Sequence, residues 1–435
     1  MRGFRLKTLA CLLVCVLALQ LCGCESLLPA EHTAAPAEST EAPAPSAPAV
    51  GTVDLMAAVV PNQPQPRPIS DKAAAAAADF SLRLFRTACE SDGNCLLAPL
   101  SVLCALSMTL NGAEGETLAQ MEQTLGLSRE DWNEFFRSWL ESCSGEGTLK
   151  IANSVWFSSA PSLSVRPEFL QTNADFYGAE VYRAPFDEST LADINTWVKD
   201  KTDGKIPEIL DRIPQEAVMY LINALAFDAR WEQPYSEDGV AAGTFRCADG
   251  TRRSVEYLYS EETRYLETET ATGFLKPYAG GKYAFAALLP NKELSPADCL
   301  ASLDGESLRA LLTEPQTAEL RVGLPKFESS FSAELSELLR GMGMKLAFAP
   351  AGADFSGLGS STAGNLYISR VLHKTFLSVA EDGTRAGAAS AVEISEKGLS
   401  PEQKQLQLDR PFLYMLLDTE TGVPFFIGVL QDPAR

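Results

Sequence analysis

The sequence predicts an α+β protein with large antiparallel sheets, and its 435 residues are enough for one large domain or two smaller ones. Segments with helical spacing of apolar residues alternate with apolar runs of strand length. The stretch from Thr244 to Leu324 is mainly strand-like, with turns expected at Asp249-Gly250, Gly280-Gly281 and Leu289-Pro290. In addition, 46% of the residues are apolar and 21% are charged, which is ordinary for a globular domain with a sizeable core.

The first elements follow from propensity and punctuation. Asp71–Cys89 is expected to be helical because the alanine run at 73–78 favours a helix and an apolar stripe follows it. A short strand comes next, and Pro99 then marks the start of a buried helix that ends at Asn111-Gly112.

Later elements show the same two periodicities. The expected strands are Ile151–Phe157, Met219–Phe227 and Leu366–Ala380, the expected helices are Glu168–Phe176, Asp193–Thr202 and, after a serine-rich link, Ala333–Gly341, and apolar segments at 409–414 and 424–430 close the domain.

The N-terminus indicates export. A basic start precedes the apolar run Leu9–Leu19, which is too short for a membrane span and is typical of a signal peptide covering residues 1–23. The run Leu21-Cys22-Gly23-Cys24 resembles a bacterial lipoprotein signal, which implies that Cys24 is lipidated; ordinary signal cleavage nearby is the alternative. We therefore expect either a lipid anchor on the outer face of a bacterial membrane or extracellular release.

A tether is expected between the signal and the domain. Residues 24–70 are dominated by Ala, Pro, Glu, Ser and Thr, a composition that buries too little apolar surface to order itself. The prolines at 61, 64, 66 and 68 favour an extended spacer. Residues 24–70 are therefore predicted to be a disordered, Pro/Ala-rich tether.

Charge and cysteine content exclude several classes of function. The net charge of −21 repels nucleic acid and anionic membrane surfaces. Six cysteines follow Cys24, and they contain no Cys-x-x-Cys pair. Cys89 and Cys95 are close enough to bridge if the local geometry allows it, but scattered cysteines in a large domain are more often buried apolar residues. We expect no essential disulfide, metal or cofactor.

Enzymatic function is also disfavoured. A hydrolase needs a general base, and the chain offers only His32, in the tether, and His373, inside an apolar strand where a buried histidine is the simpler interpretation. A hydrolase that uses His373 is the remaining enzymatic alternative, and it predicts turnover that is lost in His373→Ala.

One stretch, residues 381–397 (EDGTRAGAASAVEISEK), fits neither a good loop nor a good helix. At every second position from Thr384 to Ile394 the side chain is uncharged, whereas Arg385 and Glu393 lie on the other face. One face can be buried without a charge, yet its small side chains gain little from burial. The pattern allows a strand that forms on demand, and an Ala/Gly-rich surface loop is the alternative.

The run from Glu381 to Ser390 resembles the hinge of the serpin family, with departures at Arg385 and Gly387. Further similarities lie in the Pro-x-Ser turn before the buried helix, in Gly112-Ala-Glu-Gly-Glu-Thr, and in Trp231-Glu-Gln-Pro-Tyr, whereas Ala98 departs from the pattern. The resemblance runs in order from about residue 70 to 433 without an extra domain, which implies one serpin domain at residues 71–433. It implies the serpin fold: three β-sheets surrounded by about eight to nine α-helices, with an exposed reactive-centre loop.

The resemblance also implies roles for particular residues. The hinge would comprise Glu381, Gly383, Thr384, Ala386, Ala388 and Ser390, with a salt bridge between Lys326 and Glu381. Asn223 and His373 match positions that hydrogen-bond beneath the main sheet where its strands part, and Ser101 and Trp231 belong to the same sheet-opening region.

The implied function is a suicide-substrate inhibitor of serine proteases, a monomer without enzymatic activity that traps the acyl-enzyme by inserting its cleaved loop, from Thr384 onward, into the central sheet. The loop length that is usual in the family, counted from Glu381, places the reactive bond at Lys397-Gly398. Glu396-Lys397 and Leu399-Ser400 are the alternatives. Lys397 indicates a trypsin-like target, whereas Leu399 indicates an elastase-, chymotrypsin- or subtilisin-like one. The alternative function is a non-inhibitory binding or carrier protein with the same fold on the cell surface.

Overall fold

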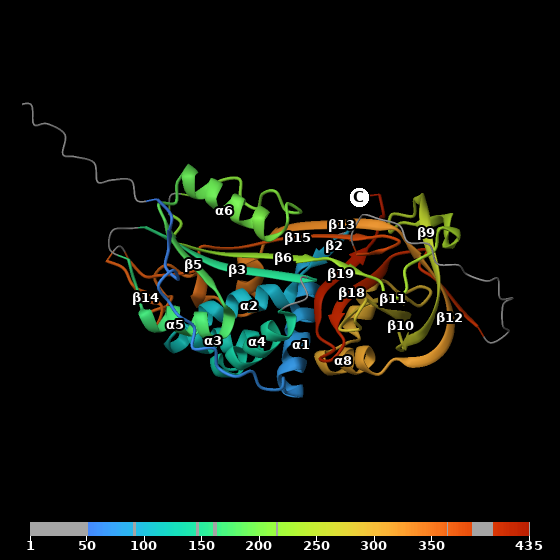
Figure 1. Ribbon diagram of the computed structural model, residues 1–435, viewed down its shortest axis with the longest axis horizontal. Helices are drawn as coiled ribbons and strands as arrows, with labels where there is room; N and C mark the ends of the chain where they lie inside the picture. Colours follow the sequence, from blue (N-terminus) through green and yellow to red (C-terminus); the bar gives the residue numbers. More distant parts are fainter. Residues whose placement is uncertain are drawn as a thin grey trace, which may run out of the picture. The chain divides into compact units, whose positions relative to one another are not determined.

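The computed structural model describes residues 51–89, 93–144, 148–159, 163–214, 216–362, 364–384 and 403–434. These residues form an α+β domain, as the sequence predicts, with helices on both faces of its central sheet (Figure 1). Cys24 and residues 385–402, which include Ala386, Ala388, Ser390 and every candidate for the reactive bond (Glu396, Lys397, Gly398, Leu399 and Ser400), lie outside the described part of the chain.

The central sheet has six strands in the order β1-β5-β3-β6-β15-β13. These are Val53–Asp54 (β1), Glu180–Ala184 (β5), Leu149–Ser158 (β3), Met219–Phe227 (β6), Arg370–Val379 (β15) and Phe327–Glu334 (β13). β6 and β15 run parallel, but their pairing covers only 220–224 with 370–374. Beyond this point β15 pairs with β13 alone among the described strands, so the far ends of β6 and β15 separate.

A second sheet has nine strands. Its path is β17-β12-β9-β10-β11-β18-β19-β2, with β8 paired to β9. These are Lys404–Gln407 (β17), Gln316–Pro325 (β12), Arg252–Glu267 (β9), Ala271–Pro277 (β10), Tyr283–Pro290 (β11), Phe412–Asp418 (β18), Pro424–Leu430 (β19), Cys95–Leu97 (β2) and Val240–Arg246 (β8). Two small ladders join β14 (Gly359–Ser360) to β4 (Ser164–Val165) and β16 (Gly383–Thr384) to β7 (Ala229–Arg230).

Nine α-helices occur in the described part of the chain. They are Asp71–Ala88 (α1), Pro99–Leu110 (α2), Gly115–Leu125 (α3), Arg129–Cys143 (α4), Pro167–Tyr177 (α5), Glu188–Lys201 (α6), Pro296–Ala301 (α7), Gly305–Thr313 (α8) and Ser336–Met342 (α9). All residues of α2 are buried, which suits a helix that is apolar on every side. It lies beneath the central sheet, whereas α6 covers the opposite face (Figure 1).

Three details of the sequence interpretation are wrong. Leu289-Pro290 ends β11 instead of forming a turn, and the serine-rich link after Phe327 is β13, whose first residue is buried. The helix predicted from Ala333 therefore begins only at Ser336. The short helices α7 and α8 were not predicted; each begins with a capping box, a local signal that the strand-like pattern around it obscures.

Residues 51–70 correct the predicted extent of the disordered tether. β1 adds to the edge of the central sheet beside β5, and the backbone of Asn62 donates to Asp175 Oδ1 at 2.6 Å. Leu55, Met56 and Ile69 pack against the core. These three apolar residues are diluted in the average composition of residues 24–70, which is why composition alone misplaced the boundary.

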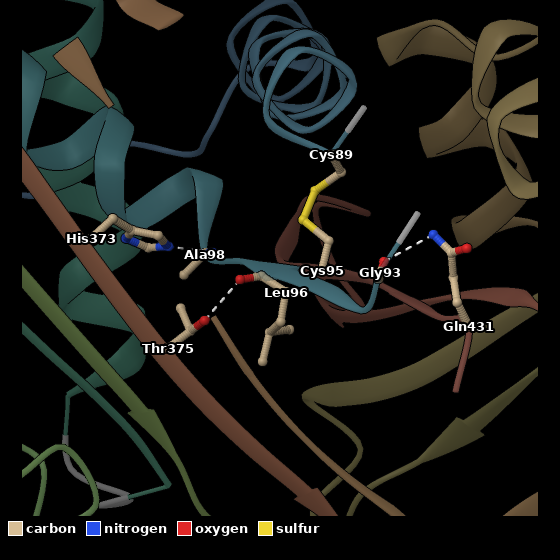
Figure 2. Close-up of a disulfide and its surroundings, with 8 residues drawn as sticks. All are labelled: Cys89, Gly93, Cys95, Leu96, Ala98, His373, Thr375 and Gln431. Carbon is tan, nitrogen blue, oxygen red and sulfur yellow. Dashed lines mark hydrogen bonds between the residues drawn. A yellow bond between two sulfur atoms is a disulfide. The ribbon is translucent and has the colours of Figure 1, made fainter. Parts of the chain in front are cut away.

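A disulfide joins Cys89, which caps α1, to Cys95, the first residue of β2, across a Cα–Cα distance of 5.9 Å (Figure 2). This disulfide corrects the expectation from the sequence, which interpreted the scattered cysteines as buried apolar residues. The fold turns the end of α1 back onto β2 and brings the two thiols together. Cys104, Cys143, Cys247 and Cys299 are free and buried.

Candidate functional site

The described part of the hinge is held at the end of the central sheet by β7. Gly383 and Thr384 form β16 and pair with Arg230 and Ala229. A Cβ atom at Gly383 would lie 2.0 Å from the carbonyl oxygen of Ala229, so the close approach of the two backbones requires glycine here. The side chain of Thr384 is buried, and its hydroxyl hydrogen-bonds the hydroxyl of Tyr278.

Glu381 and Lys326 are brought together, with Oε1 and Nζ 2.7 Å apart. Glu256 lies 3.7 Å from the same ammonium group. Partial burial opposes ionisation of Glu381, but its hydrogen bond with Lys326 prevails and lowers its pKa, while the same hydrogen bond raises the pKa of Lys326. Both side chains remain about one-third exposed (34% and 37%), so solvent screens this bridge.

Trp231 and Tyr235 hold the backbone on either side of Glu381. The indole Nε1 donates to Ala380 O at 2.9 Å, and the Trp231 amide donates to Asp382 O at 2.9 Å. The Tyr235 amide donates to Glu381 O at 3.0 Å. Trp231 therefore holds the hinge in place, as Lys326 and Thr384 do, although it is far from both in sequence.

The separated ends of β6 and β15 border a cavity of about 210 Å³. Phe227 lines it from the end of β6, and Phe376, Leu377 and Ser378 line it from β15. Thr384 lines the same cavity. The last described residue of the hinge thus lies at the opening between two parallel strands.

The other predicted cluster lies where β6 and β15 are still paired. Asn223 is directly opposite His373 in the register, and its Nδ2 donates to Ser101 O at 3.0 Å and also to Asn153 Oδ1. Nε2 of His373 accepts from the Ala98 amide at 3.1 Å (Figure 2). Ser101, Asn223 and His373 are therefore brought together around the start of α2.

The hydrogen bond that the resemblance implies between Asn223 and His373 is absent. Asn223 Oδ1 and His373 Nδ1 have no hydrogen-bond partner within the described residues. The reason is that both side chains turn toward α2, where Ser101 O and the Ala98 amide offer partners. Resemblance located the pair, but not the partner that each side chain chooses.

His373 is not placed for catalysis. Its side chain is 1% exposed, and burial lowers its pKa to about 3, so it is neutral and shielded from substrate. The Ser101 hydroxyl has no hydrogen-bond partner in the part of the chain that the structure describes, so a serine–histidine pair does not form. The described part of the chain contains no cluster of His, Cys, Asp and Glu side chains that could hold a metal ion.

Sequence reasoning missed the layer beneath the hinge. Tyr278 stacks on Trp231 with ring centroids 4.5 Å apart, and the ammonium group of Lys276 packs beside Trp231 and Tyr235. Glu262 pairs with Lys276. A lysine inside the apolar strand pattern at Leu275–Pro277 was the available signal, because a buried charge requires a partner.

Comparison with known proteins agrees with this architecture. A family model described as Serpin (serine protease inhibitor) matches residues 75–433. The chain is 31% identical over 365 residues to an uncharacterised serpin-like protein of Thermococcus kodakarensis, covering 81% of this chain and 84% of that one. It is also 31% identical over 376 residues to leukocyte elastase inhibitor A of Mus musculus, covering 81% and 97%.

A solved structure gives the same result. The thermophilic serpin tengpin in its native state superposes with a TM-score of 0.85 at 43% identity, covering 88% of this chain and all of tengpin. The family model, the relatives and the fold agree, and the chain therefore belongs to the serpin family.

Proposed function

We propose that this protein is an exported suicide-substrate inhibitor of serine proteases. The observation that carries the proposal is the position of Thr384 at the opening between β6 and β15. Residues that follow β15 through a reverse turn enter this gap antiparallel to both neighbours. This position supports our proposal that the hinge adds a strand to the central sheet once its far end is cut.

The chemistry begins as ordinary proteolysis. The serine hydroxyl of the protease attacks the carbonyl carbon of the bait residue, an ester to the protease forms, the peptide bond breaks, and the new amino terminus leaves. The segment from Thr384 onward then inserts before water hydrolyses the ester, and the attached protease is carried along and distorted. The strand adds ladder hydrogen bonds, each worth about 0.5–1.5 kcal/mol net.

The side chains that would face the interior of the sheet after insertion are small and uncharged. Positions 384, 386, 388 and 390 are Thr, Ala, Ala and Ser, so no charge is buried when the segment pairs with β6 and β15. We place the reactive bond at Lys397-Gly398, which calls for a trypsin-like protease. Leu399-Ser400 is the second candidate, and the named relative leukocyte elastase inhibitor A favours testing an elastase against it. We further propose that Cys24 carries a lipid anchor.

The decisive experiment combines adduct formation with fragment mass. The purified protein is mixed with trypsin, elastase, chymotrypsin and subtilisin, and covalent adducts are separated under denaturing conditions. The mass of the released C-terminal fragment identifies the cut bond. Cleaved protein should also unfold at a much higher temperature than uncleaved protein, because the loop has become a strand.

Two variants of Thr384 test insertion itself. Thr384→Arg introduces a charge that the sheet cannot accommodate, so the chain should still be cleaved but should no longer trap the protease. Thr384→Val is the matched control, since it keeps the size of threonine without a charge and should still trap. Stable adducts with Thr384→Arg would refute the mechanism, and cleavage without adducts or stabilisation in the native chain would instead indicate a non-inhibitory carrier.

A further inference from the structure

A buried ion pair lies beside the aromatic residues that hold the hinge. Lys276 Nζ of β10 and Glu262 Oε1 of β9 are 2.6 Å apart, and their side chains are only 3% and 9% exposed. Glu262 also accepts a hydrogen bond from Ser260 Oγ at 2.7 Å. The desolvation of two charges commonly offsets their attraction, so a contribution to stability does not by itself account for this pair.

The ammonium group of Lys276 contacts two aromatic faces. Its Nζ lies 4.6 Å from the ring centroid of Tyr235 and 5.7 Å from that of Trp231. These distances allow cation–π attraction, which is strongest where water is excluded. The two rings also meet edge to face, with centroids 6.1 Å apart. Glu262 fixes the ammonium, and the ammonium fixes both rings.

Those same two residues make the hydrogen bonds that hold the hinge. The Trp231 and Tyr235 amides donate to Asp382 O and Glu381 O, and the indole donates to Ala380 O. The hinge cannot leave β7 until these bonds open. Unlike the exposed bridge to Lys326, the restraint from Lys276 is shielded from salt.

We propose that Lys276, held by Glu262, is a positioning residue that orders the Trp231–Tyr235 turn and thereby sets how fast the hinge is released. The effect on protease trapping rests on the proposed function. The ordering of the turn is a property of the uncleaved protein and can be measured without any protease.

The test is amide hydrogen exchange in the full-length chain. Lys276→Met with Glu262→Gln removes both charges at nearly constant volume. We expect the Trp231 and Tyr235 amides to exchange at least about ten-fold faster in this double variant, while the remote Leu335 amide, which donates to Val371 O at 2.9 Å, is unchanged. Lys276→Arg keeps the cation and should restore the native protection.

A control and a reserve variant complete the design. Arg253 pairs with Asp432 at 3.0 Å on the same strand as Glu262 but away from the hinge, so Arg253→Met should leave the Trp231 and Tyr235 amides unchanged. Glu262→Gln alone weakens the pair and replaces the double variant should that one fail to fold.

Two outcomes overturn the inference: unchanged exchange at Trp231 and Tyr235, or faster exchange at all three amides, which indicates general destabilisation. Failure of the proposed function appears separately, as an absence of covalent adducts in the unaltered chain. If the chain is an inhibitor, the double variant should also lose its inhibitory form faster on warming, without being cleaved.

Discussion

The hydrogen bond between Tyr278 and Thr384 should contribute a measurable restraint on the hinge. Both hydroxyls are buried, and they join residues that are 106 positions apart. Tyr278→Phe removes one hydroxyl and keeps the ring that stacks on Trp231. Thr384→Val removes the other hydroxyl and keeps the shape of the side chain. The two changes therefore isolate a single contact.

The expected size of the coupling between the two hydroxyls follows from their burial. Each single variant leaves one buried hydroxyl unsatisfied, which costs about 1–3 kcal/mol, whereas the double variant leaves neither. The double variant should therefore lose about 1 kcal/mol less stability than the sum of the two single losses. A restraint of about 1 kcal/mol corresponds to roughly a five-fold change in the rate of hinge release.

The assay is the first unfolding transition of the uncleaved protein in urea, measured for all four members of the cycle. Hydrogen exchange at Gly383 gives an independent measure of hinge release. Additive losses, within about 0.3–0.5 kcal/mol, would show that the two hydroxyls are independent and would refute the reasoning.

Three further predictions follow from the same contacts. The pKa of His373 is about 3 in the folded protein and 6.5 ordinarily, so between these pH values the unfolded chain binds a proton that the folded chain does not. The free energy of unfolding should therefore be at its full value above pH 6.5 and should fall by about 2–3 kcal/mol by pH 4.5. Denaturant titration should show this pH dependence in the native chain and should show it removed in His373→Gln. Lys326→Met removes one of several restraints, so it should speed hinge release by less than about five-fold, at a stability cost below about 1 kcal/mol. Because the pKa of Glu381 is lowered from 4.5, the native bridge persists above pH 4.5 and is lost in more acidic solution. An unchanged rate of exchange of the Gly383 amide at neutral pH would contradict this prediction. Replacing Cys89 and Cys95 by serine opens a short loop, which should cost about 2 kcal/mol and lower the melting temperature by about 2–3 °C, measured by calorimetry against the Cys299→Ser control.

Sequence reasoning reached the elements but not their contacts. The strand Met219–Phe227 was placed at its observed bounds because its nine residues are apolar apart from Asn223, and such a run is a strong local signal. Lys326 and Glu381 were paired through resemblance, and the structure brings them together. The bounds of the strand follow from a local pattern, and the Lys326–Glu381 pair follows from motifs that keep their order along the chain.

The contacts beneath the hinge have no such local signal. Tyr278 meets Thr384 only because β7, β10 and β16 converge, and the register of three separate segments cannot be read from any one of them. The disulfide depends in the same way on the path between Cys89 and Cys95. Residues 51–70 were assigned to the tether because composition averages out the few apolar side chains that anchor a short segment.

The paired region of β6 and β15 contains two buried polar groups whose hydrogen-bonding capacity is unmet among the described residues. Because Nε2 of His373 accepts the Ala98 amide, the proton of the neutral ring is on Nδ1, a donor without a partner among the described residues. Asn223 is directly opposite His373 in the register, and its Oδ1 is an acceptor that also has no partner among the described residues. Each unmet buried group costs about 1–3 kcal/mol, so a rearrangement that satisfies both returns that energy. The restraints that hold the hinge lie at the other end of these strands, where Trp231, Tyr278 and Lys326 act one contact at a time. In the mechanism that we propose, the several small restraints at the opening would keep the sheet closed until the hinge is released, and the unmet groups at its base would then favour parting of the strands.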